Sequence, residues 1–286
     1  DSYSSITDTR LQSTILGYVM SNEKKCIEKN NARGKTIYGL LKIIFLSADT
    51  ANKINLTSLL GIPSIYEIEN KQMRDDSGRI IQQVYWYGDK DGKTFFPSFI
   101  NSFSPKEWTI TSNSEWYEIR SKKGNVWVFA NRPLDNDANL DDSAQIHLNN
   151  YLAENYLHPA VVVHRGHSYW LPRTIKRMTG AAKIIVLGSC GGFKNLNDII
   201  EVNPDAHIIS TKEIGAGDIN RPILNYLNQT FESGKILDWK NMWASLTKLF
   251  AADPSTSLRE SWESYIPPYK NLGAIFLKGY NNMAKQ

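Results

Sequence analysis

Hydrophobic residues in the first quarter of the chain recur at the spacing of a helix. The pattern is clear at Ile15, Leu16 and Val19 and again over residues 40–45. Gly61-Ile62-Pro63 then interrupts it, as glycine and proline do at the ends of elements. We therefore predict a helical segment over residues 1 to about 75.

Between about residue 79 and residue 130 the pattern is typical of strands. Residues 80–86 form an apolar run that ends in the turn-forming segment 88–92. A second pair of runs, around 116–119 and 125–130, is joined by Lys122-Lys123-Gly124. These features predict a β-hairpin region.

From Asn125 onward, short apolar runs alternate with helical patterns. The apolar runs are residues 126–130, 160–163, 184–187 and 207–209, and the helical patterns between them cover 140–152, 172–178 and 196–200. Strands that are apolar throughout and linked by helices predict a mostly parallel sheet with helices on both faces. We also expect a helix from Asn220 to near Gly234 and a late strand at Leu272–Leu277. The fold class is α/β, with a region of unknown role over 1–115 and the α/β domain over 116–286.

Composition and charge exclude several classes of function. The net charge of +4 is spread over 286 residues without a basic block, so nucleic acid is not an expected partner. The longest apolar run, residues 37–48, is shorter than the roughly 18 residues that cross a bilayer. The chain begins with Asp rather than Met, so we expect a preceding segment to have been removed. Such processing permits a secreted or periplasmic location and leaves the compartment open.

The two cysteines stand in different sequence contexts. Two cysteines form at most one disulfide, which excludes a disulfide scaffold and a cysteine-only zinc site. Cys26 lies in a charged stretch with no histidine nearby, and we interpret it as incidental. Cys190 follows an apolar strand within Gly188-Ser189-Cys190-Gly191-Gly192. Cys190 is therefore the candidate for chemistry, although a buried free cysteine with no chemical role is the simpler alternative.

A histidine stands at the equivalent place after the preceding predicted strand. His167 lies four residues beyond Val163, as Cys190 lies three beyond Leu187. Functional groups collect at the carboxyl ends of parallel strands, so neighbouring strands would bring imidazole and thiol into one cleft. In such a pair the histidine can deprotonate the thiol and later protonate a leaving amine.

The residues around this pair indicate how the site is built. Glycines next to Cys190 allow a tight turn, and N–H groups near Gly191, at the start of a helix, are candidates for an oxyanion hole. His164 points to the opposite face of its strand from His167, which predicts a packing role rather than a metal site. We expect neither a metal nor another cofactor.

Two segments, each made of an apolar strand and the residues that follow it, carry His167 and Cys190. They resemble the corresponding segments of the caspase-like cysteine peptidases of clan CD, including bacterial relatives with the same Arg-Gly-His-Ser and Gly-Ser-Cys-Gly-Gly pairing. The resemblance covers roughly residues 120–250. It implies a caspase-like sheet and peptide-bond hydrolysis with Cys190 as nucleophile and His167 as general acid and base. Where most of the superfamily has Gly after the histidine, this chain has Ser168, whose N–H is the second oxyanion candidate.

The resemblance also implies a pocket that selects the residue before the scissile bond. It directs attention to the segment after the fourth strand, where Glu213 or Asp218 would favour a basic residue and Lys212 an acidic one. The expected partner is a peptide or protein substrate; the oligomeric state stays open. Two alternatives remain: a catalytically silent caspase-like scaffolding module, and a cysteine hydrolase or acyltransferase acting on a non-peptide amide.

Overall fold

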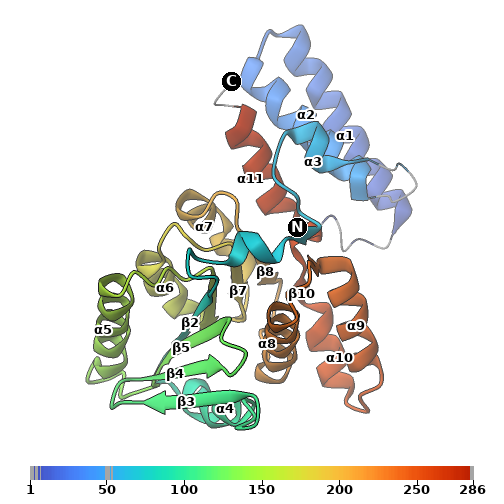
Figure 1. Cartoon of the computed structure of the whole chain (residues 1–286). Helices are drawn as coiled ribbons and strands as arrows, with labels where there is room; N and C mark the ends of the chain where they lie inside the picture. The colour runs from blue at the N-terminus through green and yellow to red at the C-terminus, as the bar shows by residue number, and fades with distance from the viewer. Residues whose placement is uncertain (1–2, 4–5, 7, 49–51, 53, 284–286) are drawn as a thin grey trace. The chain divides into compact units, whose positions relative to one another are not determined.

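The chain folds into two compact units, a helical unit of residues 1–65 and 268–286 and an α/β unit of residues 66–267 (Figure 1). This computed structural model describes residues 3, 6, 8–48, 52 and 54–283. The boundary differs from the one expected near residue 115, because residues 80–86 pair in the same sheet as the later strands. Local patterns identify that strand but not its partners.

The helical unit confirms the helical pattern of the N-terminal sequence. Its helices are α1 (Thr9–Glu28), α2 (Ala32–Ala48), α3 (Leu56–Leu60), the 3-10 helix η6 (Pro268–Lys270) and α11 (Leu272–Met283). Asp8 caps α1, because its carboxylate accepts the N–H groups of Arg10 and Leu11. Leu40 and Ile44 of α2 are buried in this unit.

The prediction of a late strand at Leu272–Leu277 is wrong, since these residues begin helix α11. A six-residue apolar run fits a strand and a buried helix equally well, so periodicity alone does not distinguish them. Packing distinguishes them here. Gly279 of α11 comes so close to α2 and α3 that a Cβ there would lie 3.3 Å from side-chain atoms of Leu40 and Leu60.

The α/β unit is built on an eight-stranded sheet with the strand order β10-β8-β7-β6-β2-β5-β4-β3. Its strands are β2 (Ile80–Trp86), β3 (Trp108–Ser112), β4 (Trp116–Ser121), β5 (Val126–Asn131), β6 (Val161–Arg165), β7 (Ile184–Leu187), β8 (His207–Thr211) and β10 (Tyr265–Ile266). The five strands from β8 to β5 run parallel, and the remaining pairs are antiparallel. The predicted α/β class and mostly parallel sheet are confirmed. A separate two-stranded ladder joins β1 (Glu67–Ile68) and β9 (Leu237–Asp238).

Helices cover both faces of this sheet. They are α4 (Lys90–Asn101), α5 (Leu140–Glu154), α6 (Leu171–Arg177), α7 (Leu196–Val202), α8 (Gly217–Glu232), α9 (Trp239–Ala251) and α10 (Thr256–Glu263), with 3-10 helices η3 (Asn70–Met73), η4 (Ser168–Trp170) and η5 (Gly192–Asn195). Adjacent residues of β2 point to opposite faces of the sheet, and each is hydrogen-bonded to a helix on its own face. The side chain of Gln82 donates to Asn228 of α8, and that of Gln83 donates to Asn149 of α5.

Helix α4 occupies a segment in which we predicted only turns and strands. Gly92 and Pro97 lie within this helix, and because both residue types disfavour helices, the local sequence does not indicate one. Asp89 begins the helix by accepting the N–H of Gly92 at 2.8 Å. Gly92 itself packs on the preceding strand end, where a Cβ would lie 1.9 Å from the carbonyl oxygen of Tyr87.

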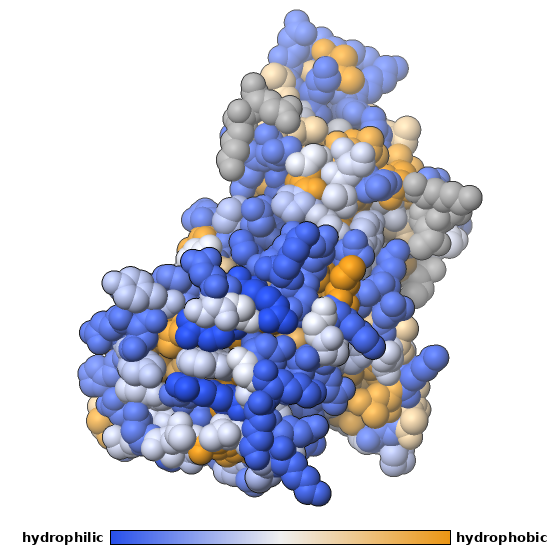
Figure 2. All heavy atoms as spheres, in the orientation of Figure 1, coloured by the Kyte–Doolittle hydropathy of each residue, from blue (hydrophilic) through white to orange (hydrophobic). Residues whose placement is uncertain are grey.

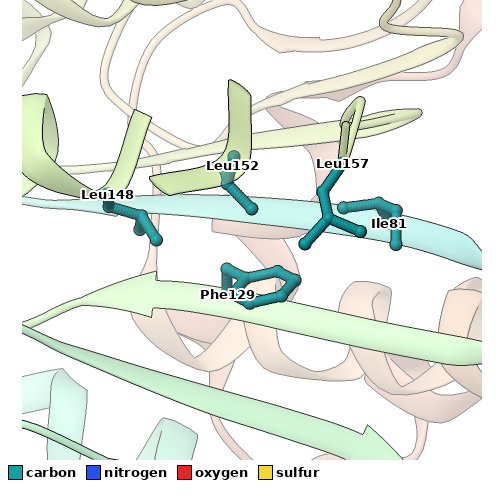
Figure 3. Close-up of a cluster of buried hydrophobic side chains, with 5 residues drawn as sticks. All are labelled: Ile81, Phe129, Leu148, Leu152 and Leu157. Carbon is teal, nitrogen blue, oxygen red and sulfur yellow. The ribbon is translucent and has the colours of Figure 1, made fainter. Parts of the chain in front are cut away.

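The central strands owe their position to apolar packing on both faces. One buried cluster joins Ile81, Phe129 and three leucines around α5 (Figure 3). The outer surface differs: in the view of Figure 2 the α/β unit is mostly hydrophilic, with hydrophobic residues gathered over α9 and α10, and further hydrophobic residues lie on the helical unit. Among the described residues, every helix is too short or too polar to cross a membrane.

Shortening one side chain in this cluster should destabilise the α/β unit measurably. Ile81→Val removes one buried methylene group, and we expect the free energy of unfolding to fall by about 1 kcal/mol. The matched control is Ile146→Val on α5, because Ile146 is 43% exposed and its shortening should change little. Urea denaturation followed by tryptophan fluorescence measures both. Equal effects of the two substitutions would show that Ile81 does not stabilise the core.

Candidate active site

Three adjacent parallel strands end at one edge of the sheet, and the candidate residues follow these ends. The register pairs Trp86 of β2 with Arg165 of β6, and His164 of β6 with Leu187 of β7. Each strand continues into a short glycine-containing loop. The predicted adjacency of the His167 and Cys190 strands is therefore present.

A small cleft opens between these loops. It has about 50 Å³ of space accessible to water, and its lining includes Asp91, Arg165, His167, Cys190 and Asn220. The nucleophile and base candidates thus share one cavity. Helices α4 and α8 supply its other walls, because Phe95 and the first residues of α8 also line it.

The loop that carries His167 is fixed by aromatic packing. Gly166 lies against Tyr87, where a Cβ would come within 2.6 Å of the ring. The imidazole of His167 stacks on Tyr169 with 5.3 Å between ring centroids. Its Nε2 lies 3.6 Å from Oδ2 of Asp91, an ion pair when the ring is protonated. Asp91 is therefore placed to orient the imidazole, a residue that the sequence pattern did not indicate.

The loop that carries Cys190 is held by hydrogen bonds between its backbone and the hydroxyl of Thr211. Gly191 has a φ of +63°, in the left-handed region that glycine adopts readily, which turns the chain after Cys190. Thr211 of β8 accepts the N–H of Gly192 and donates to the carbonyl of Ser189. The thiol of Cys190 is exposed at this turn, whereas Cys26 is half-buried on α1 of the helical unit.

The backbone N–H groups near Cys190 are not equivalent. The N–H of Gly191 donates to the carbonyl of Glu213 at 2.8 Å, so this oxyanion candidate already has a partner. Within the described residues, the N–H groups of Ser168 and Cys190 make no hydrogen bond. Both N–H groups are therefore without an acceptor, and of these two residues only Cys190 lines the cleft.

His164 has the packing role that its strand position predicts. It is fully buried, its Nδ1 lies 2.7 Å from the hydroxyl of Thr174, and its Nε2–H donates to the carbonyl of His167 at 3.3 Å. Burial lowers the pKa of His164 to about 4, so the imidazole is neutral near pH 7. A neutral His164 fixes the backbone of the loop that presents His167.

The three residues expected to form a specificity pocket do not line the cleft. Lys212 donates its backbone N–H to Ser264, and Glu213 is exposed. Asp218 is exposed and pairs with Arg221 at 3.8 Å, beside a different cavity near α10. What this segment contributes is backbone: Gly215 and Gly217 line the cleft, and a Cβ on Gly215 would lie 2.2 Å from the carbonyl oxygen of Gly188.

Two further polar residues line the cleft, and only one of them has a signal in the sequence. Arg165 ends a buried strand that begins with three valines, a position at which a charge is unusual enough to be noticed. Asn220 has no such signal. It is buried, donates to the carbonyl of Gly188 at 3.1 Å and accepts from the hydroxyl of Tyr265 at 3.0 Å, which ties α8 to the Cys190 loop.

Within the part of the chain that the structure describes, no three His, Cys, Asp or Glu residues are grouped as metal ligands. No protein-family model, curated protein or solved structure matches this chain.

Proposed function

We propose that this protein is a caspase-like cysteine endopeptidase. The observation that carries the proposal is that His167 and Cys190, which follow adjacent parallel strands, line the same cleft. The exposed thiol, the orienting carboxylate of Asp91 and the two available N–H groups are the other parts that acyl transfer requires. The mostly parallel sheet is consistent with the family that the sequence resembles.

In the proposed reaction, His167 takes the thiol proton and Sγ of Cys190 attacks the carbonyl carbon of the scissile peptide bond. The N–H groups of Ser168 and Cys190 donate to the oxyanion that forms. His167 then gives its proton to the leaving amine, the C–N bond breaks, and a thioester remains on Cys190. Water, deprotonated by His167, attacks the thioester and releases the carboxylate product together with the regenerated thiol.

The test is the rate at which a peptide electrophile, such as a peptidyl vinyl sulfone, alkylates each cysteine. We expect Cys190 to react at least about 100-fold faster than Cys26, because the dyad and the peptide-binding cleft act together on one thiol. Peptide mapping by mass spectrometry assigns the modified residue. The preference should shrink in His167→Ala, which removes the base and leaves the exposure of Cys190 in place.

Iodoacetamide is the control for exposure, because Cys190 is more exposed than Cys26 and a small reagent will prefer it without any catalysis. The proposed function predicts a ratio of Cys190 to Cys26 labelling that is higher for the peptide electrophile than for iodoacetamide. Equal ratios for the two reagents, with no effect of His167→Ala, would contradict the proposal.

A further inference from the structure

One side chain in the cleft is a buried cation that the proposed dyad does not use. Arg165 is the last residue of β6 and is only 9% exposed, yet it lines the cleft that contains Cys190. It stands two residues before His167, and β6 alternates its faces, so His164 and Arg165 point to opposite sides of the sheet. His164 faces Thr174 of α6, and Arg165 faces the side on which the cleft opens.

The contacts of Arg165 leave its charge without a counterion. Its guanidinium lies 4.9 Å from the ring centre of Trp86, its partner in register on β2. This cation–π contact fixes the position of the guanidinium but does not bring an anion to it. Among the described residues, Arg165 has neither an ion pair nor a side-chain hydrogen bond.

The two acids whose charges act on Arg165 have other partners. Asp91 lies beside His167, and Asp218 pairs with Arg221. Burial lowers the pKa of Arg165 to about 10, while Tyr265, Asp218 and Asp91 act in the opposite direction. The guanidinium therefore remains charged near pH 7.

A buried charge without a partner is costly, and an incoming anion would compensate it. Guanidinium presents a planar fork of N–H donors that matches a carboxylate, and charge-assisted bonds of this kind are among the stronger ones in proteins. A bound peptide places the side chain of the residue before the scissile bond close to the attacked carbonyl. In this cleft that position is next to both Cys190 and Arg165.

We propose that Arg165 binds the carboxylate of an aspartate or glutamate at P1, the residue immediately before the scissile bond. This inference rests on the proposed function, since P1 has meaning only for a peptidase. It places specificity at the end of β6 rather than in the segment 211–220, which contributes only backbone and Asn220 to the cleft. It also makes the favoured substrate acidic, the opposite of what Glu213 or Asp218 would select.

The first test uses the unaltered protein and fluorogenic peptides that differ only at P1. Aspartate and glutamate should give kcat/KM about 10- to 100-fold higher than the isosteric asparagine and glutamine, because only the acids supply the charge. Peptide aldehydes with P1 aspartate should inhibit more strongly than those with P1 asparagine. Faster cleavage after arginine, lysine or the amides would overturn the inference.

The second test compares Arg165→Gln with Arg221→Gln, a substitution of an exposed arginine outside the cleft. Arg165→Gln should bring the ratio of kcat/KM for aspartate over asparagine to within about threefold of unity. Arg221→Gln should keep the wild-type ratio. An unchanged ratio in Arg165→Gln would overturn the inference, and if that variant does not fold, the P1 panel on the unaltered protein still decides.

Labelling of Cys190 separates failure of this inference from failure of the proposed function. If the peptide electrophile selects Cys190 and peptides are cleaved without preference for an acid, only the role of Arg165 is wrong. If Cys190 is not selected and no peptide is cleaved, the proposed function is wrong and this inference is wrong with it.

Discussion

Cys190→Ala should lower kcat for peptide hydrolysis by at least about 10³-fold, because in the proposed reaction its thiol is the nucleophile on which the thioester forms. His167→Ala should have an effect of similar size, since in the proposed reaction the same histidine receives the thiol proton and protonates the leaving amine. The double variant should be no slower than the slower single variant, because the effects of substituting two residues that act as one unit do not add. Steady-state hydrolysis of a P1-aspartate peptide by all three variants measures this.

Cys26→Ala is the matched control for this experiment. It also removes a free cysteine, but Cys26 lies on α1 of the helical unit and outside the cleft, so activity should stay near that of the wild type. Independent, additive losses in Cys190→Ala and His167→Ala would contradict a dyad. Full activity in Cys190→Ala would contradict the peptidase proposal itself.

The stability of the α/β unit should decrease as the pH falls from about 6.5 toward 4, through the titration of His164. Its pKa is about 4 in the folded state and 6.5 as the ordinary value. In this range the unfolded chain binds a proton that the folded chain does not, so stability rises with pH. A difference of this size corresponds to about 3 kcal/mol, fully present above pH 6.5 and lost by pH 4.

The structural cause is the environment of His164. The ring is fully buried, and its Nδ1 accepts from the hydroxyl of Thr174 when Nε2–H donates to the carbonyl of His167. Protonation would remove this acceptor and place a charge in the interior beside the positive charge of Arg165. Acid should therefore loosen the His167 loop first.

Urea midpoints at pH 7, 5.5 and 4.5 measure this effect, with tryptophan fluorescence as the probe. All eight tryptophans lie between residues 86 and 262, so the signal reports on the α/β unit. His164→Gln should be less stable at pH 7 and should lose most of the slope between pH 6.5 and 4. His147→Gln is the control, because the side chain of His147 is 55% exposed and should leave the slope unchanged. The same slope in His164→Gln would show that other groups cause it.

The part of the site that depends on local pattern could be predicted from the sequence. Runs of four apolar residues end at Val163 and at Leu187, and such runs indicate buried strands whatever the rest of the chain does. Glycine-containing loops then follow each strand, with Cys190 and His167 at nearly equal distances from the strand ends. Parallel strands align their carboxyl ends, so adjacent placement of the two residues follows from topology.

The parts that depend on distant pairing could not be predicted. Strand β2 lies between β6 and β5, so the sheet contains residues that the sequence assigns to a separate N-terminal region. Strand β2, which the sequence pattern did not assign to this sheet, positions Trp86 beside Arg165 and leads into the helix that carries Asp91. The prediction of a strand at Leu272–Leu277 is wrong for the same kind of reason, because packing against α2 and α3 selects the helix.

The sequence by itself therefore determined the α/β class, the hairpin of β4 and β5, and the placement of His167 and Cys190 after the ends of adjacent strands. Periodicity and glycine placement are local properties, and each constrains only its immediate neighbours. The tertiary structure decided which strands pair, which N–H groups already have partners, and which charge is buried without a counterion. These depend on groups far apart in the chain: among the described residues, Arg165 is buried beside Trp86 and no carboxylate forms an ion pair with it.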